Sequence, residues 1–112
     1  KYGDDMVDAA QGAIRDLTVE QYRAWTQLGQ QIQARLEAAV RAGLSPEGEA
    51  GREVAALHRR WLTVTGNRYD PAKHRGIAEL YVGDPRFTAY YDKTVPGCAR
   101  FLRDAVAHWV KG

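Results

Sequence analysis

Side chains that could bind a flat organic molecule are concentrated between residues 58 and 91. Six aromatic residues and two histidines fall in this stretch: Trp61, Tyr69, Tyr81, Phe87, Tyr90 and Tyr91, with His58 and His74. Pockets for small molecules are built in this way, from an apolar wall with a few placed polar groups. Composition alone favours a simpler interpretation, in which these residues form the core of a small domain that needs large side chains for stability.

Two predicted helical faces could bring these side chains together. On a helix that begins at Pro71, four residues share one face at spacings of i, i+3, i+4 and i+7. They are His74, Ile77, Ala78 and Tyr81. The preceding helix has the same arrangement in His58, Trp61, Leu62 and Thr65. Joined by a loop that carries Tyr69, the two faces could close over an apolar ligand.

The sequence offers little for catalysis or metal binding. It has no Gly-x-Ser-x-Gly, phosphate-binding glycine loop, His-Glu-x-x-His or Cys-x-x-Cys motif. The single cysteine, Cys98, lies on an apolar helical stripe, where we expect it to be buried. His58 and His74 fall on the polar–apolar borders of their helices, and hydrogen bonding within the core is favoured over a metal site. We therefore predict no enzyme, no catalytic residue, no metal and no cofactor.

Length and charge narrow the class of protein. The 112 residues suit one domain, and the 16 basic and 14 acidic side chains are mixed along the chain. A DNA-binding domain usually has a clustered basic stripe, so we expect no direct DNA contact. No apolar run reaches the roughly 20 residues of a membrane span. A single cysteine fits a reducing cytoplasm, and the start at Lys1 suggests a piece of a longer protein.

Helix start and stop signals divide the chain into about six helices, and no strand pattern occurs. A stripe of Met6, Ala9, Ala10 and Ala13 predicts the first helix. Thr18 and Gln21 predict a capping box for the second, which should end at Gly43. Later helices should begin at Pro46, Pro71, Pro85 and Pro96. The third should end at Gly66, the fourth at Val82 before Gly83, and the fifth near Lys93. Gly48 and Gly51 predict a flexible loop over 44–53.

A family resemblance is carried by residues 58–106. The specific part is His58-x-x-Trp61, a sixteen-residue step to His74, then Gly76, Glu79 and the Leu80–Val82 run. It continues in the segments Asp84, Arg86–Phe87, Tyr90–Lys93, Pro96–Gly97 and Phe101–Ala105. This segment resembles the TipAS antibiotic-recognition domain, the effector-binding part of a group of MerR-family transcription activators. We take 1–112 as one such domain, with 54–110 as the core of the match and 1–43 matching more loosely.

The resemblance implies an all-α, globin-like fold around a ligand cleft. It also implies binding of drug-like natural products, among them thiopeptides and albicidin. The chain would then be the ligand-binding part of a homodimeric regulator that contacts DNA only through a MerR-type domain outside this chain. The first helix would tighten when the ligand binds. A stand-alone antibiotic-sequestering resistance protein is an alternative, and a haem or tetrapyrrole carrier is a weaker one.

One departure from the family pattern bears on the chemistry. Thiopeptide-binding members have a cysteine on the helix after Asp70–Pro71, which can add to a dehydroamino acid of the ligand. Gapless alignment places Gly76 at that position. We therefore expect non-covalent recognition.

For ligand contacts we predict His58, Trp61, Tyr69, His74, Ile77, Tyr81, Phe87 and Tyr91. Trp61, Tyr81 and Phe87 would pack or stack against the ligand, while His58, His74 and Tyr69 would form hydrogen bonds with it. Tyr69→Phe should lower affinity with little change in stability.

Overall fold

The computed structural model describes residues 18–111, and this part of the chain is entirely helical apart from turns and loops. Its elements are α2 (Val19–Arg41), α3 (Glu49–Thr63), α4 (Pro71–Gly83), α5 (Pro85–Tyr91) and α6 (Cys98–Trp109). The all-α fold class is confirmed. The predicted first helix, with Met6 and its alanine stripe, lies outside the described residues.

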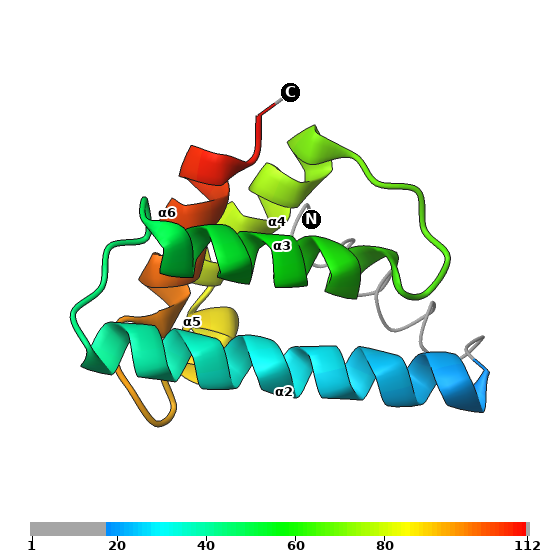
Figure 1. Ribbon diagram of the computed structural model, residues 1–112, viewed down its shortest axis with the longest axis horizontal. Helices are drawn as coiled ribbons and strands as arrows, with labels where there is room; N and C mark the ends of the chain where they lie inside the picture. The colour runs from blue at the N-terminus through cyan, green and yellow to red at the C-terminus, as the bar shows by residue number, and fades with distance from the viewer. Residues whose placement is uncertain (1–17, 112) are drawn as a thin grey trace.

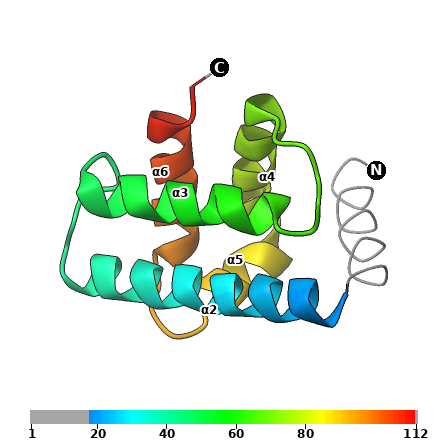
Figure 2. The same cartoon turned by 45° about the vertical axis from the view of Figure 1, so that its right-hand side comes forward.

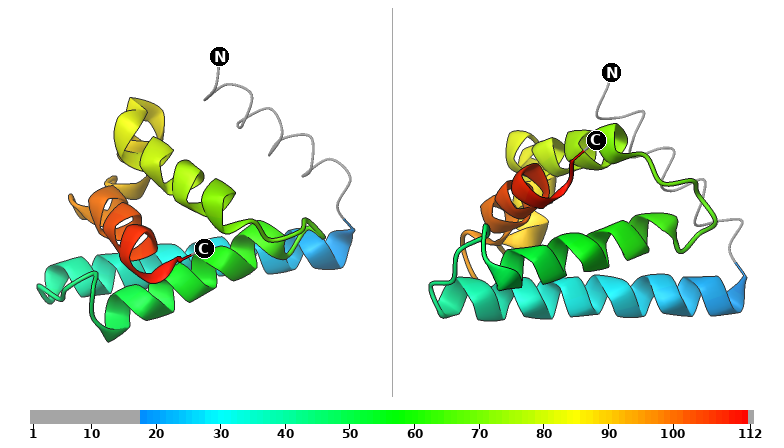
Figure 3. Two further views of the ribbon diagram at one scale, coloured as in Figure 1. Left: turned by 90° about the horizontal axis from the view of Figure 1, so that it is seen from above. Right: turned by 45° about the horizontal axis from the view of Figure 1, so that its top comes forward.

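Two pairs of helices form the domain (Figure 1). The long helix α2 runs antiparallel to α3, and these two pack side by side. Helices α4 and α6 run antiparallel to each other and cross the first pair steeply, with the short α5 at one end, as Figure 2 shows. The views in Figure 3 show α4 and α6 leaning over the same side of α3. The core lies between the pairs, and its fully buried residues include Leu36, Val54, Leu102 and Val106.

Both predicted ends of α2 and the predicted starts of α4 and α5 are confirmed. Thr18 and Gln21 form the capping box, each side chain bonding the backbone of the other residue. At the other end of α2, Gly43 adopts a φ of 69°, and the backbone N–H groups of Gly43 and Leu44 return to the carbonyls of Val40 and Ala39. This is a Schellman motif, in which a left-handed residue satisfies the last carbonyls of a helix. The Asp70 and Asp84 side chains cap α4 and α5.

Five boundary predictions were wrong, and one of them is the end of α3, which lies at Thr63 rather than at Gly66. Helix α3 begins at Glu49, so 44–53 is a turn followed by helix, and the Ser45 hydroxyl caps only the local turn by accepting from the Glu47 N–H. Helix α6 begins at Cys98, because the Asp92 carboxylate accepts a hydrogen bond from the Ala99 N–H. Helices α4 and α5 end at Gly83 and Tyr91, and Gly83 lies inside α4 without a positive φ.

Gly51 is required by a close approach within the chain. A Cβ atom at this position would lie 1.7 Å from the carbonyl oxygen of Pro46, a backbone atom that cannot turn aside. The same carbonyl accepts a hydrogen bond from the Trp109 indole at 3.2 Å. Gly51 therefore lets the turn before α3 fold onto the first turn of the helix and bond to α6.

Gly51→Ala should lower the free energy of unfolding by about 1–3 kcal/mol, because the Pro46 backbone must move to admit the methyl group. Gly83→Ala is the matched control. No atom lies within 4 Å of its added Cβ, so we expect a gain of up to about 1 kcal/mol from reduced chain entropy. Urea denaturation of both variants measures the difference. Equal effects of the two substitutions would contradict the close contact.

Candidate functional site

Four of the predicted site residues form one chain of hydrogen bonds. The Tyr69 hydroxyl bonds to His74 Nδ1 at 2.9 Å, and His74 Nε2 bonds to His58 Nδ1 at 2.8 Å. The chain ends where His58 Nε2 meets the Tyr81 hydroxyl at 2.9 Å. It links the loop before α4 to α3 and then to the far end of α4. Each ring nitrogen of the two histidines is therefore used once.

The two histidines are core residues rather than border residues. His58 is 0% and His74 1% exposed, and Tyr81 is 3% exposed. The sequence placed the histidines on the polar–apolar borders of their helices, and this placement was wrong. A buried polar group is stable when its hydrogen bonds are made, as they are here. In this conformation the three residues lie behind the surface and could act on a ligand only through Tyr69 or through the packing around them.

Burial keeps both histidines neutral. Burial, together with a smaller effect of the neighbouring His74, lowers the pKa of His58 to about 3. Burial also lowers the pKa of His74 to about 4, helped by the positive charges of Arg59 and Arg75. A neutral imidazole has one donor and one acceptor. The three bonds are then satisfied together only if both rings donate in the same direction, either from Tyr69 towards Tyr81 or the reverse.

A row of aromatic rings continues from this chain to α2. The Trp61 ring lies 5.6 Å from His58 at an interplanar angle of 19°, and 5.4 Å from Trp25 at 25°. Gly29, one helical turn after Trp25, lies beside the same ring, and a Cβ there would make an ordinary van der Waals contact of 3.5 Å with Trp61 Nε1. Sequence reasoning did not include Trp25 in the site. Its spacing of four residues from Gly29 on one stripe of α2 was the available signal.

The remaining predicted residues surround Tyr81 or line the same side of α4. Tyr81 contacts Phe87 and Tyr91, with ring centroids 5.5 Å and 4.7 Å apart. Tyr91 is buried, whereas Phe87 and Ile77 are half-buried and pack against the core. The structure thus brings seven of the eight residues into one connected cluster of rings, with Ile77 beside the same core. Among the eight, the half-buried Trp61, Tyr69, Ile77 and Phe87 are the residues that a ligand could reach without opening the core.

Tyr69 is tied to this core, which changes what its substitution would report. Removing its hydroxyl leaves His74 Nδ1 without its partner, a loss of about 1 kcal/mol for an ordinary hydrogen bond. The sequence-based expectation that Tyr69→Phe would leave stability nearly unchanged is therefore revised.

The cluster does not suit a metal or haem. Within residues 18–111, no group of three or more His, Cys, Asp or Glu side chains could hold a metal ion. Axial ligation of haem by a histidine needs a free imidazole nitrogen, and all four nitrogens of His58 and His74 are engaged in the core. Ligation by either residue would break the hydrogen-bond chain. The donor set therefore fits a structural role.

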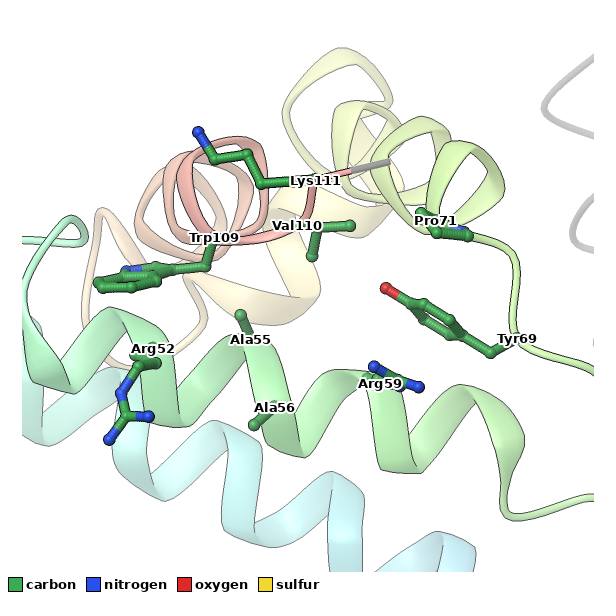
Figure 4. Close-up of a pocket in the computed structure, with 9 residues that line it drawn as sticks. All are labelled: Arg52, Ala55, Ala56, Arg59, Tyr69, Pro71, Trp109, Val110 and Lys111. Atoms are coloured by element: carbon green, nitrogen blue, oxygen red, sulfur yellow. The ribbon is translucent and has the colours of Figure 1, made fainter.

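A separate pocket of about 530 Å³ opens between α3, the start of α4 and the end of α6 (Figure 4). Its lining residues are Arg52, Ala55, Ala56, Arg59, Tyr69, Pro71, Trp109, Val110 and Lys111. Tyr69 is the one residue that it shares with the predicted site. Sequence reasoning missed this pocket because its walls come from three elements up to about 60 residues apart in the chain.

The single cysteine lies away from both places. Cys98 is 0% exposed at the start of α6, as expected, and burial raises the pKa of its thiol to about 11. A thiol must lose its proton to act as a nucleophile. Cys98 is therefore protonated and shielded at neutral pH. None of the helices described between residues 18 and 111 is long and apolar enough to cross a membrane.

Comparison with known proteins gives one consistent family. The TipAS antibiotic-recognition domain matches residues 1–109. The chain is 33% identical over 78 residues to the HTH-type transcriptional activator TipA of Streptomyces coelicolor, covering 68% of this chain and 30% of TipA. It is 24% identical over 115 residues to the HTH-type transcriptional regulator SkgA of Caulobacter vibrioides, covering 99% of this chain and 45% of SkgA. The chain thus spans less than half the length of these relatives.

A solved structure has the same fold. The TipAS protein of Streptomyces lividans in complex with nosiheptide, described as part of a thiopeptide antibiotic resistance system, superposes with a TM-score of 0.75. The sequences are 25% identical, and the match covers 89% of this chain and 70% of that one. The predicted resemblance and the predicted fold are both confirmed.

Proposed function

Because the chain belongs to the TipAS antibiotic-recognition domain family, we propose that it is a non-catalytic effector-binding domain for bulky, hydrophobic natural products of the antibiotic type. The observation that carries this proposal is the family match over residues 1–109, supported by the structural likeness to a TipAS protein that binds nosiheptide. Aromatic side chains on the four elements α2, α3, α4 and α5 supply the apolar wall that such a ligand needs.

We place the ligand against the half-buried members of the ring cluster. Trp61, Tyr69, Ile77 and Phe87 would contact it directly, whereas His58, His74, Tyr81 and Tyr91 would hold these side chains in position from the core. This division follows from burial, because a buried side chain can support the binding surface but cannot contact a ligand bound to that surface. Tyr69 connects the two groups through its bond to His74.

The function of the whole protein is a further step of the proposal. The relatives are named as HTH-type regulators, and this chain covers only part of each. We infer a cytoplasmic, homodimeric parent protein in which ligand binding here favours the active form of an attached MerR-type DNA-binding domain. A stand-alone sequestering protein is the alternative. The open reading frame upstream of Lys1 distinguishes them, since only the regulator encodes a helix-turn-helix segment there.

Titration with nosiheptide tests the proposed contacts. Trp61→Phe keeps an aromatic ring in the row between Trp25 and His58 but removes contact area, so affinity should fall about threefold to tenfold. Trp109→Phe, on α6 beside the separate pocket, is the control and should bind as the wild type does. Calorimetry measures both. An equal loss in the two variants, or no binding by the wild type to any thiopeptide or albicidin-like compound, would reject the proposal.

Capture of a thiopeptide should be non-covalent in the wild type. Cys98 is buried and protonated, so incubation with a thiopeptide that carries a dehydroamino acid should leave the mass of the denatured protein unchanged. Gly76→Cys should yield an adduct equal to the mass of the ligand, because the thiolate adds across the carbon–carbon double bond and no atom leaves. Intact-mass spectrometry reads both. An adduct on Cys98 would contradict the account of that residue.

A further inference from the structure

The pocket beside α6 combines an apolar floor with a basic rim. Ala55 of α3 lies on the floor, and Trp109 and Val110 line the pocket from the end of α6. Figure 4 shows Arg59 and Tyr69 beside the same opening, with the Tyr69 hydroxyl directed towards it, while Lys111 lies at the upper edge and its side chain extends away from the floor. Its volume of about 530 Å³ falls in the range of about 300–1,000 Å³ typical of small-molecule sites.

Two of the three basic residues that line this pocket have no acidic partner among residues 18–111. Among its lining residues within 18–111, three are basic and none is acidic. Arg52 pairs with Glu49 at 2.7 Å, but no carboxylate of residues 18–111 lies within 4 Å of the charged groups of Arg59 or Lys111. Arg59 instead places its guanidinium 4.0 Å above the centroid of the Tyr69 ring. This contact holds the cation at the mouth of the pocket and leaves its planar donors available for an anion.

The Tyr69 hydroxyl adds a neutral polar group to the rim. Burial raises its pKa, so the hydroxyl keeps its proton at neutral pH and can donate to an acceptor. If it donates to a ligand, His74 Nδ1 must donate to the Tyr69 oxygen, and the hydrogen-bond chain behind it still closes in the reversed direction. Tyr69 can therefore act as either a donor or an acceptor towards a ligand, and in neither case is a buried group of the chain left without a hydrogen bond.

We propose that this pocket is a second ligand site, which binds a flat aromatic carboxylate. The carboxylate would pair with the Arg59 guanidinium, where a fork of donors matches its two oxygens. Its ring would lie on the apolar floor against Trp109, and Lys111 would add a second positive charge. The site lies beside the ring cluster around Trp61 and shares Tyr69 with it, so the anionic and the hydrophobic ligand would compete for that side chain.

The test compares two probes of the same shape, 2-naphthoate and its neutral amide, on the full chain in low salt. Nuclear magnetic resonance titration should show naphthoate binding at least about tenfold more tightly than naphthamide, as expected for a charge-assisted contact. The Trp109 indole N–H signal should shift, and that of Trp25 should not. Equal affinity for the two probes, or shifts spread over both tryptophans, would overturn the proposal.

Arg59→Gln should weaken naphthoate binding about tenfold and leave naphthamide binding unchanged. Arg60→Gln is the matched control, because it removes the same charge from the next residue of α3, which does not line the pocket. Lys111→Gln, near the exposed end of the chain, is a second variant that cannot disturb the core and should weaken binding about threefold. Equal losses of naphthoate affinity in the Arg59 and Arg60 variants would show that the anion is attracted only by the overall positive charge of the surface, and would reject the site.

Discussion

Replacing His58 by alanine should lower the free energy of unfolding by about 3–5 kcal/mol. The side chain is fully buried, and both of its ring nitrogens are hydrogen-bonded. The substitution leaves His74 Nε2 and the Tyr81 hydroxyl without partners, at about 1–3 kcal/mol for each buried polar group. It also opens a cavity beside Trp61, which adds to the loss. A domain of this size has about 5–15 kcal/mol to lose.

Denaturation in urea measures this effect, and His108→Ala serves as the control. His108 lies on α6 and is half-buried, with a ring contact to Trp109 but no part in the buried chain. We expect it to cost under about 1 kcal/mol. If His58→Ala were as mild as His108→Ala, the buried hydrogen-bond chain could not be the main support of this core.

Stability should fall steeply as the pH drops from 7 to 5. The pKa values of His58 and His74 lie near 3 and 4 in the folded protein, below the ordinary value of 6.5 in the unfolded chain. The unfolded state therefore binds protons that the folded state excludes. The stabilising contribution is complete above pH 6.5 and is lost as the pH falls towards the folded values. With about 1.4 kcal/mol per pH unit for each histidine, the loss between pH 7 and pH 5 is about 3–4 kcal/mol.

Two measurements check this dependence. Unfolding free energies at pH 7, 6 and 5 should decrease, before most surface carboxylates begin to titrate. The imidazole C2 proton signals of His58 and His74 should hold their positions over the same range while the protein stays folded. Ordinary titration of both signals near pH 6.5 would show that the pair is hydrated and would contradict the burial on which the prediction rests.

The helices could be predicted well wherever their signals are local. The capping box at Thr18, the left-handed Gly43 and the Asp–Pro pairs at positions 70 and 84 each act within a few residues, and each is confirmed. The start of α6 was missed because its cap comes from Asp92, seven residues before the N–H that it accepts from. The start of α3 was missed because Pro46 packs onto Gly51 in place of opening the helix.

The sequence could predict which residues belong to the site but not how these residues are arranged in space. Helical spacing put His58 and His74 on faces that could meet, and the two rings are indeed bonded to each other. Helical spacing could not show that the contact between the two rings is buried, because the neighbouring arginines make both positions resemble the polar–apolar border of a helix. The pocket that Arg59 lines could not be predicted from the sequence, because its lining depends on how the end of α6 packs beside α3. The burial of the histidine pair and the pocket both result from tertiary packing, which cannot be derived from helical patterns in a single sequence.

A thermal melt with a panel of thiopeptides, albicidin-like compounds and cationic dyes tests the central claim most directly. At tenfold excess over its dissociation constant, a true ligand adds about 1.4 kcal/mol to the folded state, which raises the midpoint of a domain this size by about 5–10 °C. We expect such a shift for at least one multi-ring compound, and a smaller shift for the same compound in Trp61→Phe. A midpoint that stays fixed across the whole panel would contradict an antibiotic-recognition function for this domain.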